Sequence, residues 1–477
     1  MQGTSFHLSE KMKIIKDVNG LIHIEGDKTT SSRLSGRYGE TPFTVAGAVA
    51  GFKAPAFSLT FALPIFHPED FGYQSLPAGY QIRDVSGDVS LRNDLWQVRS
   101  LSAKLNDSVV TARGSVQDGR ERVIKGDVSF SYLKGEDLAA VMKLEKTGDK
   151  KTAGPPLSIQ TTVRAAAGKL GELSFSDLRA ELTYNANKPE FPPLIKATVR
   201  AATGKLDDLY FKDLHADLGY NADKLEFSSL TWAMQSGRGT AKGSTQLSAA
   251  SSPRHNYQFQ LDRVPAEALF WTAEKADKDR RVKGTVTARG DLTATGKTAA
   301  EMKASASGMV KMRIEKGIIR KVNTLYKMFS VLNMSQLLKF KLPNMTADGM
   351  PYNSITATLL LTNGIMTSKD FYIDSEAINI LAMGSMDIIK EKIDLKVGLQ
   401  PLQTLDKIVS RIPVVGWILT DEDRRFITVY FEVKGPVEDP EVKAIPVREL
   451  SAEGLDMIKR VFKLPQKLIT DTREVLY

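Results

Sequence analysis

The stretch Thr162–Phe191 reads TVRAAAGKLGELSFSDLRAELTYNANKPEF, and Thr198–Phe227 is a near-copy that reads TVRAATGKLDDLYFKDLHADLGYNADKLEF. The offset between the copies is a constant 36 residues (198 − 162). In each copy apolar residues alternate, one position is skipped, and the alternation resumes. Period 2 is the period of a β-strand, and a one-residue skip keeps the apolar face on one side only if the strand bulges there. The repeat therefore predicts bent β-strands.

The same rhythm occurs outside the copies. Trp96 and Val98 are followed by Leu101, and Leu225 and Phe227 are followed by Leu230. Near the N-terminus, Phe57-x-Leu59-x-Phe61 alternates without a skip. The pattern predicts a mainly β protein, with a long repetitive antiparallel sheet and a few amphipathic helices towards the C-terminus. Strands and helices do not alternate, which disfavours a doubly wound nucleotide-binding fold.

Composition places the chain among folded proteins. Of its 477 residues, 42% are hydrophobic and 25% are charged, which excludes wholesale disorder. Cysteine is absent, so neither disulfides nor thiolate chemistry contribute. No apolar run is long enough to span a bilayer as a helix, and the first residues lack the apolar core of a signal peptide. We expect an export signal or membrane anchor to be encoded upstream.

The order of strand-like, polar and helical patterns predicts six segments. They are short β repeats over 1–80, a β repeat unit over 81–145, a linker or long loop over 146–157, repeated bent strands over 158–300, a mixed region over 301–442 with helices near 317–341 and 402–419, and a helical tail over 443–477.

The net charge of +9 is concentrated in one segment. Between Lys311 and Lys341 there are eight basic residues and one acidic residue, a local excess of +7 (8 − 1). An amphipathic helix with this charge could bind anionic lipid head groups or nucleic acid, or it could simply cap the sheet. The strand-like neighbours argue against nucleic acid as the partner.

The sequence offers no convincing catalytic or metal-binding motif. Gly237–Ser244 (GRGTAKGS) has the wrong order for a phosphate-binding loop, and the acidic run Asp421–Asp423 is followed by two arginines that neutralise it. The five histidines are scattered without metal-ligand spacing. We therefore predict that the chain is not an enzyme and binds no cofactor or metal.

The region Gly308–Val442 resembles the C-terminal region of the AsmA family, which includes YhdP-like and TamB-like proteins. The residues that carry the resemblance are Ile314–Ile319 (IEKGII), Asn363–Ile373 (NGIMTSKDFYI), Met383–Leu395 (MGSMDIIKEKIDL) and Gly435–Val442 (GPVEDPEV). The upstream bent strands are similar to the repeats of this family. The chain departs from the family in lacking an N-terminal membrane anchor.

The resemblance implies a sheet curled into an open apolar groove that carries lipids between the two membranes of a bacterial envelope. A sheet without covering helices must bury its apolar rows by curling or by holding a ligand. The candidate lipid-groove residues are Trp96, Val98, Leu101, Leu105, Leu173, Phe175, Leu178, Leu182, Leu209, Phe211, Leu214, Leu218, Phe227, Leu230, Trp232 and Met234. The candidate membrane-contact residues are Ile318, Val322, Leu325, Phe329, Leu332, Arg320, Lys321, Lys327, Val415, Trp417 and Ile418.

The resulting hypothesis is a non-enzymatic, periplasmic carrier of phospholipids that supports outer-membrane assembly. Its expected partners are an acyl-chain lipid, a membrane surface and unidentified envelope proteins, and nucleic acid is not among them. It would be associated with the inner membrane through the upstream anchor. Two alternatives stay open: a structural or adhesive β-repeat protein with a filled core, and a glycan hydrolase built on a β-solenoid.

Overall fold

The structure is a computed structural model. It describes residues 1–6, 13–51, 54–142, 155–185, 194–206, 209–221, 223–234, 236–247, 252–269, 282–320, 327–328, 349–376, 378–401, 418–420 and 427–446. Contacts divide the chain into a first unit, Met1–Leu230, and a second unit, Thr231–Tyr477. The boundary falls inside strand β15 (Lys224–Met234). The division of the chain into six segments remains a proposal.

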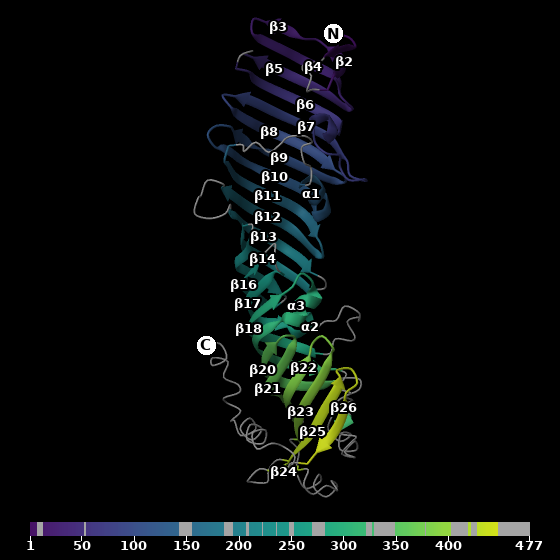
Figure 1. Cartoon of the computed structure of the whole chain (residues 1–477), viewed down its shortest axis with the longest axis vertical. Coiled ribbons are helices and arrows are strands. Elements are labelled where there is room, and N and C mark those ends of the chain that lie inside the picture. The colour runs from purple at the N-terminus through teal and green to yellow at the C-terminus, as the bar shows by residue number, and fades with distance from the viewer. Residues whose placement is uncertain are drawn as a thin grey trace. The chain divides into compact units, whose positions relative to one another are not determined.

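The first unit is built from strands that pair with their neighbours in chain order from β4 to β14, and Figure 1 shows β5 to β12 lying side by side. Its elements are β1 (Thr4–Phe6), β2 (Ile15–Gly20), β3 (His23–Glu25), β4 (Lys28–Tyr38), β5 (Thr41–Ala50), β6 (Ala56–Phe66), the 3-10 helix η1 (Pro68–Phe71), β7 (Ile82–Arg92), β8 (Leu95–Leu105), β9 (Ser108–Gln117), β10 (Arg122–Lys134), α1 (Gly135–Met142), β11 (Leu157–Leu170), β12 (Leu173–Asn185), β13 (Leu194–Leu206) and β14 (Leu209–Asn221).

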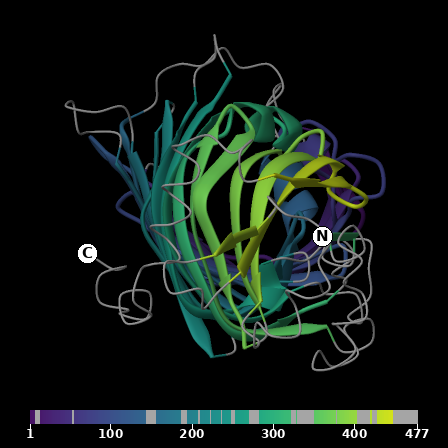
Figure 2. The same ribbon diagram turned by 90° about the horizontal axis from the view of Figure 1, so that it is seen from below.

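The second unit is also a sheet of neighbouring antiparallel strands, and the short helices α2 and α3 lie at two of its described connections. Its elements are β16 (Gly237–Gln246), β17 (Arg254–Pro265), α2 (Ala266–Leu269), β18 (Val282–Thr295), α3 (Ala299–Ser305), β19 (Ser307–Ile319), β20 (Met350–Thr362), β21 (Ile365–Asp374), β22 (Ile378–Asp387), β23 (Lys392–Pro401), β24 (Ile418–Thr420), β25 (Ile427–Pro436) and β26 (Glu441–Ile445). Figure 2 shows the long strands of this unit bending along their length. The predicted mainly β fold class is confirmed.

Short turns join most of these strands and fix their pairing. The β7–β8 turn places Asn93 and Asp94 at φ of 49° and 61°, and the β20–β21 turn places Asn363 and Gly364 at 47° and 76°. Two successive positive φ values are typical of the type I′ turn, whose twist matches that of a two-stranded ribbon. Asparagine, aspartate and glycine tolerate these angles best, so the turn sequences set the register of the hairpins.

Among the described strand pairings, one departs from the antiparallel order. Strands β10 and β11 are parallel, with Arg122 opposite Leu157 and Lys134 opposite Lys169. A parallel pair needs a crossover connection, and here the connection begins with helix α1. The predicted linker at 146–157 belongs to this crossover. Its described end shows Leu157 already in β11, and residues 146–154 lie outside the described ranges.

The predicted bulge is confirmed at one of the skips and wrong at the paired copies. Between Val98 and Leu101 the register of β8 with β9 shifts by one residue, as a bulge requires. In the copies no residue is added, since Ala165–Leu178 and Ala167–Ser176 keep one register across the skip. Instead Asp177 and its counterpart Asp213 adopt φ of 50° and 51°. The side chains of both paired strands therefore switch faces at the same level, and their register stays constant.

The predicted helix at 317–341 is wrong at its beginning. Gly317, Ile318 and Ile319 belong to β19 and pair with Tyr352, Pro351 and Met350 of β20. Lys327 and Met328 are helical, and residues 321–326 and 329–341 lie outside the described ranges. The prediction placed the start of the helix at Gly317 because apolar residues from Ile318 onwards are spaced by three and four. In the structure β19 continues to Ile319, two residues past Gly317.

Two further helix predictions overlap strands. Of the helix predicted near 402–419, residues 418–419 lie in β24, which pairs with β25, and residues 402–417 are outside the described part. The tail predicted to be helical over 443–477 starts in β26, which ends at Ile445. Residues 447–477 are outside the described part.

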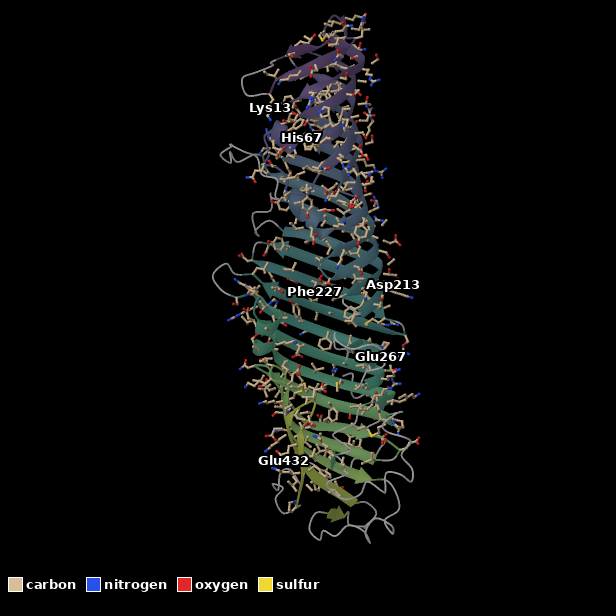
Figure 3. All side chains as sticks on the ribbon, turned by 90° about the vertical axis from the view of Figure 1, so that its right-hand side faces the viewer. Lys13, His67, Asp213, Phe227, Glu267 and Glu432 are labelled. Atoms are coloured by element: carbon tan, nitrogen blue, oxygen red, sulfur yellow. The ribbon has the colours of Figure 1, made fainter. Side chains whose placement is uncertain are left out.

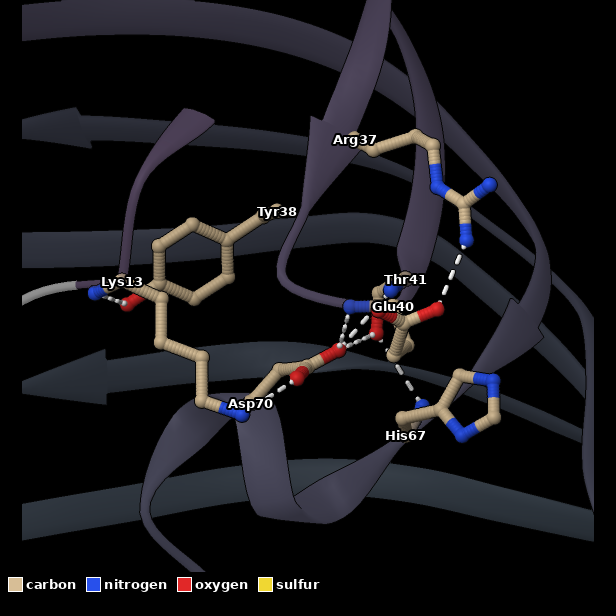
Figure 4. A network of polar contacts seen from close by, with 7 residues as sticks. All are labelled: Lys13, Arg37, Tyr38, Glu40, Thr41, His67 and Asp70. Atoms are coloured by element: carbon tan, nitrogen blue, oxygen red, sulfur yellow. Dashed lines mark hydrogen bonds and ion pairs between the residues drawn. The ribbon is translucent and has the colours of Figure 1, made fainter. Parts of the chain in front are cut away.

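A buried aspartate anchors η1 against the start of β5 (Figure 4). The side chain of Asp70 is 2% exposed, and its Oδ2 accepts hydrogen bonds from the backbone N–H groups of Glu40 and Thr41 and from the Thr41 hydroxyl, at 2.9, 2.8 and 2.7 Å. The Lys13 ammonium donates to Oδ1 at 2.8 Å. Burial opposes ionisation of Asp70, but the hydrogen bonds from Lys13 and Thr41 outweigh it and lower its pKa.

We expect Asp70→Asn to lower the free energy of unfolding by about 3 kcal/mol at pH 7, because the exchange leaves the Lys13 charge without its partner and the two backbone donors poorly matched. A lowered folded-state pKa stabilises the fold above the ordinary value of 3.8, and that stabilisation is lost as the pH falls through the folded value. Urea titrations at pH 7 and pH 3 measure both effects. Glu40→Gln, at an exposed side chain, is the control; an equal loss in both variants would contradict the prediction.

Candidate functional site: an apolar face in the first unit

The apolar face of the first unit is built by strict alternation along its strands. In β6, Phe57, Leu59, Phe61 and Leu63 are half-buried, and the residues between them are exposed. Their cross-strand partners in β7 include Leu91, Val89 and Val85. The β7 residue opposite Phe61 is Gly87. Alternation therefore places one continuous row of apolar side chains on a single face.

Over this face lies a hollow of about 560 Å³. Its lining is apolar except for one threonine and the tyrosine hydroxyl. The lining residues are Tyr38, Thr41, Phe43, Val45, Leu59, Phe61, Leu63, Phe66, Phe71, Ile82, Val85, Leu101 and Ala103. Phe71 contacts Phe66 and Tyr38, with ring centroids 5.0 and 5.2 Å apart, so η1 closes one side with an aromatic cluster. The network of Asp70 holds η1 in this place.

A second hollow of about 200 Å³ adjoins the first, since Ile82 and Ala103 line both. Strands β8, β9 and β10 form its floor and helix α1 forms its wall. The remaining lining residues are Leu105, Ser108, Val110, Phe130, Tyr132, Leu133, Lys134, Asp137, Leu138 and Val141. The two hollows form one apolar track that crosses strands β5 to β10.

Aromatic rings on this face lie flat over glycines of the neighbouring strand. A methyl group placed on Gly87 would come within 2.7 Å of the Phe61 ring, and one on Gly36 within 2.9 Å of Phe43. Further along the first unit, Phe175 covers Gly168 and Phe211 covers Gly204 in the same way. A ring that covers a glycine fills the space of the missing side chain and lies close to the backbone, so it projects less from the sheet. The glycines therefore set the depth of the apolar face.

The opposite face of the same strands is polar and charged. Asp127 of β10 bridges Arg113 of β9 and Arg164 of β11, at 3.1 and 3.0 Å. Hydrogen bonds from Arg113 and then Arg164 lower the pKa of Asp127. This bridge crosses the parallel β10–β11 pair. Because this face carries charged groups, the apolar face is the one suited to a hydrophobic ligand. Figure 3 shows the described side chains along the strands.

The predicted groove residues separate into four groups. Leu101 lines the larger hollow and Leu105 the smaller one. Trp96 packs edge-on against Phe57 with ring centroids 5.2 Å apart and is 39% exposed. By contrast, Phe175 is 6% exposed and forms a core cluster with Leu133, Ala165 and Ala201, against which Leu173, Leu178 and Leu214 pack.

The other predicted groove residues lie in strands and line neither of the two apolar hollows. Val98, Leu182, Leu209, Leu218, Phe227, Leu230 and Trp232 are half-buried, Phe211 and Met234 are buried, and Trp232 covers Gly239 in the second unit. That these residues contact a ligand remains a prediction.

The sequence prediction missed the residues that line most of the larger hollow. Tyr38, Phe43, Phe66 and Phe71 lie in the segment 1–80, which was assigned only short β repeats. One signal was present, because Phe57-x-Leu59-x-Phe61 alternates aromatic and aliphatic residues. Another is a seven-residue spacing between glycine and an aromatic residue, which pairs them across a hairpin with a two-residue turn, as in Gly36 and Phe43.

The second unit has a dense core in its later strands. Leu381, Leu399, Tyr430 and Phe431 are almost completely buried. Adjacent residues such as Tyr430 and Phe431 point to opposite faces of a strand, so both faces of β25 are covered. Burial raises the pKa of the Tyr430 phenol to about 12. This part of the chain resembles a filled core more than an open face.

The described candidate membrane-contact residues do not gather on one helix. Ile318 and Ile418 lie in strands β19 and β24, and Arg320 directly follows β19. Lys327 donates to Asp439 and to the Pro440 carbonyl oxygen, the latter at 2.8 Å. The candidates Lys321, Val322, Leu325, Phe329, Leu332, Val415 and Trp417 lie outside the described residues.

Part of the basic segment is a strand. Lys311, Arg313 and Lys316 lie in β19, and the Arg313 guanidinium donates to Glu315 at 2.9 Å.

Across the described ranges, no group of three acidic or histidine side chains could hold a metal ion. No helix in the described part of the chain has the length and apolar character needed to cross a membrane.

Comparisons with known proteins point to one family. A family model described as YhdP protein matches residues 78–442. The intermembrane phospholipid transporter YhdP of Escherichia coli (strain K12) is 20% identical over 158 residues, which cover 30% of this chain and 12% of that protein. The chain therefore aligns with a small part of that relative's length. No solved structure matches the chain.

Proposed function

Because the chain belongs to the YhdP protein family, we propose that the apolar face of its first unit holds the acyl chains of phospholipids and guides them from strand to strand. The observation that carries the proposal is the continuous apolar track formed by the two hollows. Each methylene group moved from water onto such a surface gains about 0.8 kcal/mol. A uniform lining gives similar energies at successive positions, so a chain can slide without a deep trap.

In this role the chain is a carrier and not an enzyme. The track offers acyl chains mainly dispersion contacts, and its polar lining residues include Tyr38, Thr41, Ser108, Lys134 and Asp137. We propose that the protein works in the periplasm between the inner and outer membranes and supports outer-membrane assembly, in keeping with the name of the Escherichia coli relative, an intermembrane phospholipid transporter. Envelope proteins and a membrane surface are its proposed partners.

A filled-core structural role is the second candidate. The cluster around Phe175 and the dense core of the second unit favour it for those parts of the chain. The two roles are compatible if only β5 to β10 form the track. A test must therefore compare lipid contact at the two faces of a strand that lies inside the track.

Photo-crosslinking tests the carrier function at neighbouring positions of β6. A benzophenone amino acid at Leu59, on the apolar face, is expected to capture phospholipid, and the same group at Ala62, on the exposed face, is not. Mass spectrometry of the crosslinked peptide identifies the lipid. We expect at least about a tenfold difference in yield, because only Leu59 lies in the apolar environment that an acyl chain prefers. Equal yields at both positions, or no lipid at Leu59, would contradict the proposal.

A further inference from the structure

Asp137 places a buried carboxylate at the wall of the smaller hollow. It lies in the first turn of α1, is 5% exposed and lines the hollow. Its Oδ1 accepts a hydrogen bond from the Asn106 side-chain amide at 3.0 Å. Its Oδ2 is buried, and no group among the described residues donates to it. A buried carboxylate oxygen without a donor is costly, and a turn of the Asp137 side chain towards the hollow would bring this oxygen to a ligand that carries a donor.

The surroundings of Asp137 restrict the kind of ligand. Leu105, Val110, Phe130 and Leu138 present hydrocarbon to the same hollow of about 200 Å³. The hollow continues into the larger one through Ile82 and Ala103. A ligand that fills both spaces has a small hydrogen-bond donor at one end and a long apolar part at the other. Such a molecule is an amphiphile whose head group carries a proton donor.

We propose that Asp137 forms a head-group subsite for phospholipids that end in a primary ammonium group, as in phosphatidylethanolamine. A primary ammonium carries three N–H donors and a positive charge, and both complement the unpaired Oδ2. A quaternary ammonium has the charge without a donor, and a glycerol head group has donors without the charge. The inference rests on the proposed carrier function, because it assumes that the acyl chains occupy the adjoining track.

One basic residue lies close to Asp137 in the sequence and lines the same hollow. Lys134, which ends β10 three residues before Asp137, also lines the hollow. Because it does not donate to Oδ2, its ammonium is not used to satisfy the carboxylate. The carboxylate is therefore left for a donor that the ligand itself brings.

Calorimetric titration of the purified full chain with dihexanoyl lipids, kept below their micelle concentration, tests the subsite. The expected affinity for phosphatidylethanolamine is at least about tenfold higher than for phosphatidylcholine or phosphatidylglycerol, the range of one charge-assisted hydrogen bond. Asp137→Asn is expected to reduce this preference to less than about threefold. Glu136→Gln removes the same charge from an exposed neighbour on the same helix and should leave the preference unchanged.

A graded series on the unaltered chain gives a readout that does not depend on the folding of a variant. Stepwise N-methylation of the ethanolamine lipid is expected to weaken binding most when the last N–H is removed. Equal affinity for all head groups would overturn the subsite and leave the carrier function standing, and so would an Asp137→Asn variant that keeps the preference. If the unaltered chain binds none of the lipids, the carrier function itself fails.

Discussion

Replacing Leu59 with glutamate is expected to abolish lipid loading while leaving the first unit folded. Leu59 lines the larger hollow and is half-buried, so the new carboxylate can reach water when the track is empty. When an acyl chain enters, the carboxylate loses that hydration without gaining a donor. The cost of burying an unpaired polar group corresponds to at least about a hundredfold loss of lipid occupancy. Quantifying lipids that co-purify with the chain measures this loss.

Thr60→Glu is the matched control, because Thr60 is the next residue of β6 and its side chain lies on the exposed face. We expect this variant to load lipid as the unaltered chain does. Urea unfolding of both variants separates the two hypotheses for the site. If Leu59→Glu unfolds the first unit, the hollow is part of a filled core; if it folds and still loads lipid normally, the lipid does not use this track.

Local pattern was enough to identify the strands and one of the bulges. The skip between Val98 and Leu101 predicts the observed register shift. The extra residue that interrupts the alternation in β8 is the same residue that has no partner in β9. The skip in the 36-residue copies has the same sequence pattern and a different cause. There both strands change phase at the same level, with Asp177 in a left-handed conformation, and a single strand's pattern does not distinguish these solutions.

The candidate site required information that no single segment carries. Phe61 faces Gly87 across 26 residues, and Ile82 meets both hollows because β7 pairs with β6 and β8. Asp137 reads as an ordinary acid at a helix start, where carboxylates are common. Its burial and its unpaired oxygen depend on how α1 folds back over β10. Tertiary pairing also overrode the helical spacing near Ile318, which β20 holds in a strand.

Gly87→Ala is expected to obstruct the track without altering its chemistry. Gly87 does not have a positive φ, so alanine adds no backbone strain there. Its methyl group would lie 2.7 Å from two carbons of the Phe61 ring, closer than van der Waals contact allows. The ring must therefore tilt into the hollow that it lines. We expect lipid loading to fall about tenfold and the free energy of unfolding to fall by about 1 kcal/mol.

The cause of that loss can be isolated with a rescue variant. Phe61→Leu in the Gly87→Ala background removes the ring that the methyl group displaces, so loading should recover to within about threefold of the unaltered chain. Gly119→Ala is the control, because the nearest atom to its added methyl group, the Glu121 carbonyl oxygen, is 3.8 Å away. Loss of loading in Gly119→Ala, or no recovery in the double variant, would show that the glycines do not act through the depth of the apolar face. Recovery would establish that a ring lying flat on glycine keeps the track open, because the double variant restores space and not the original residues.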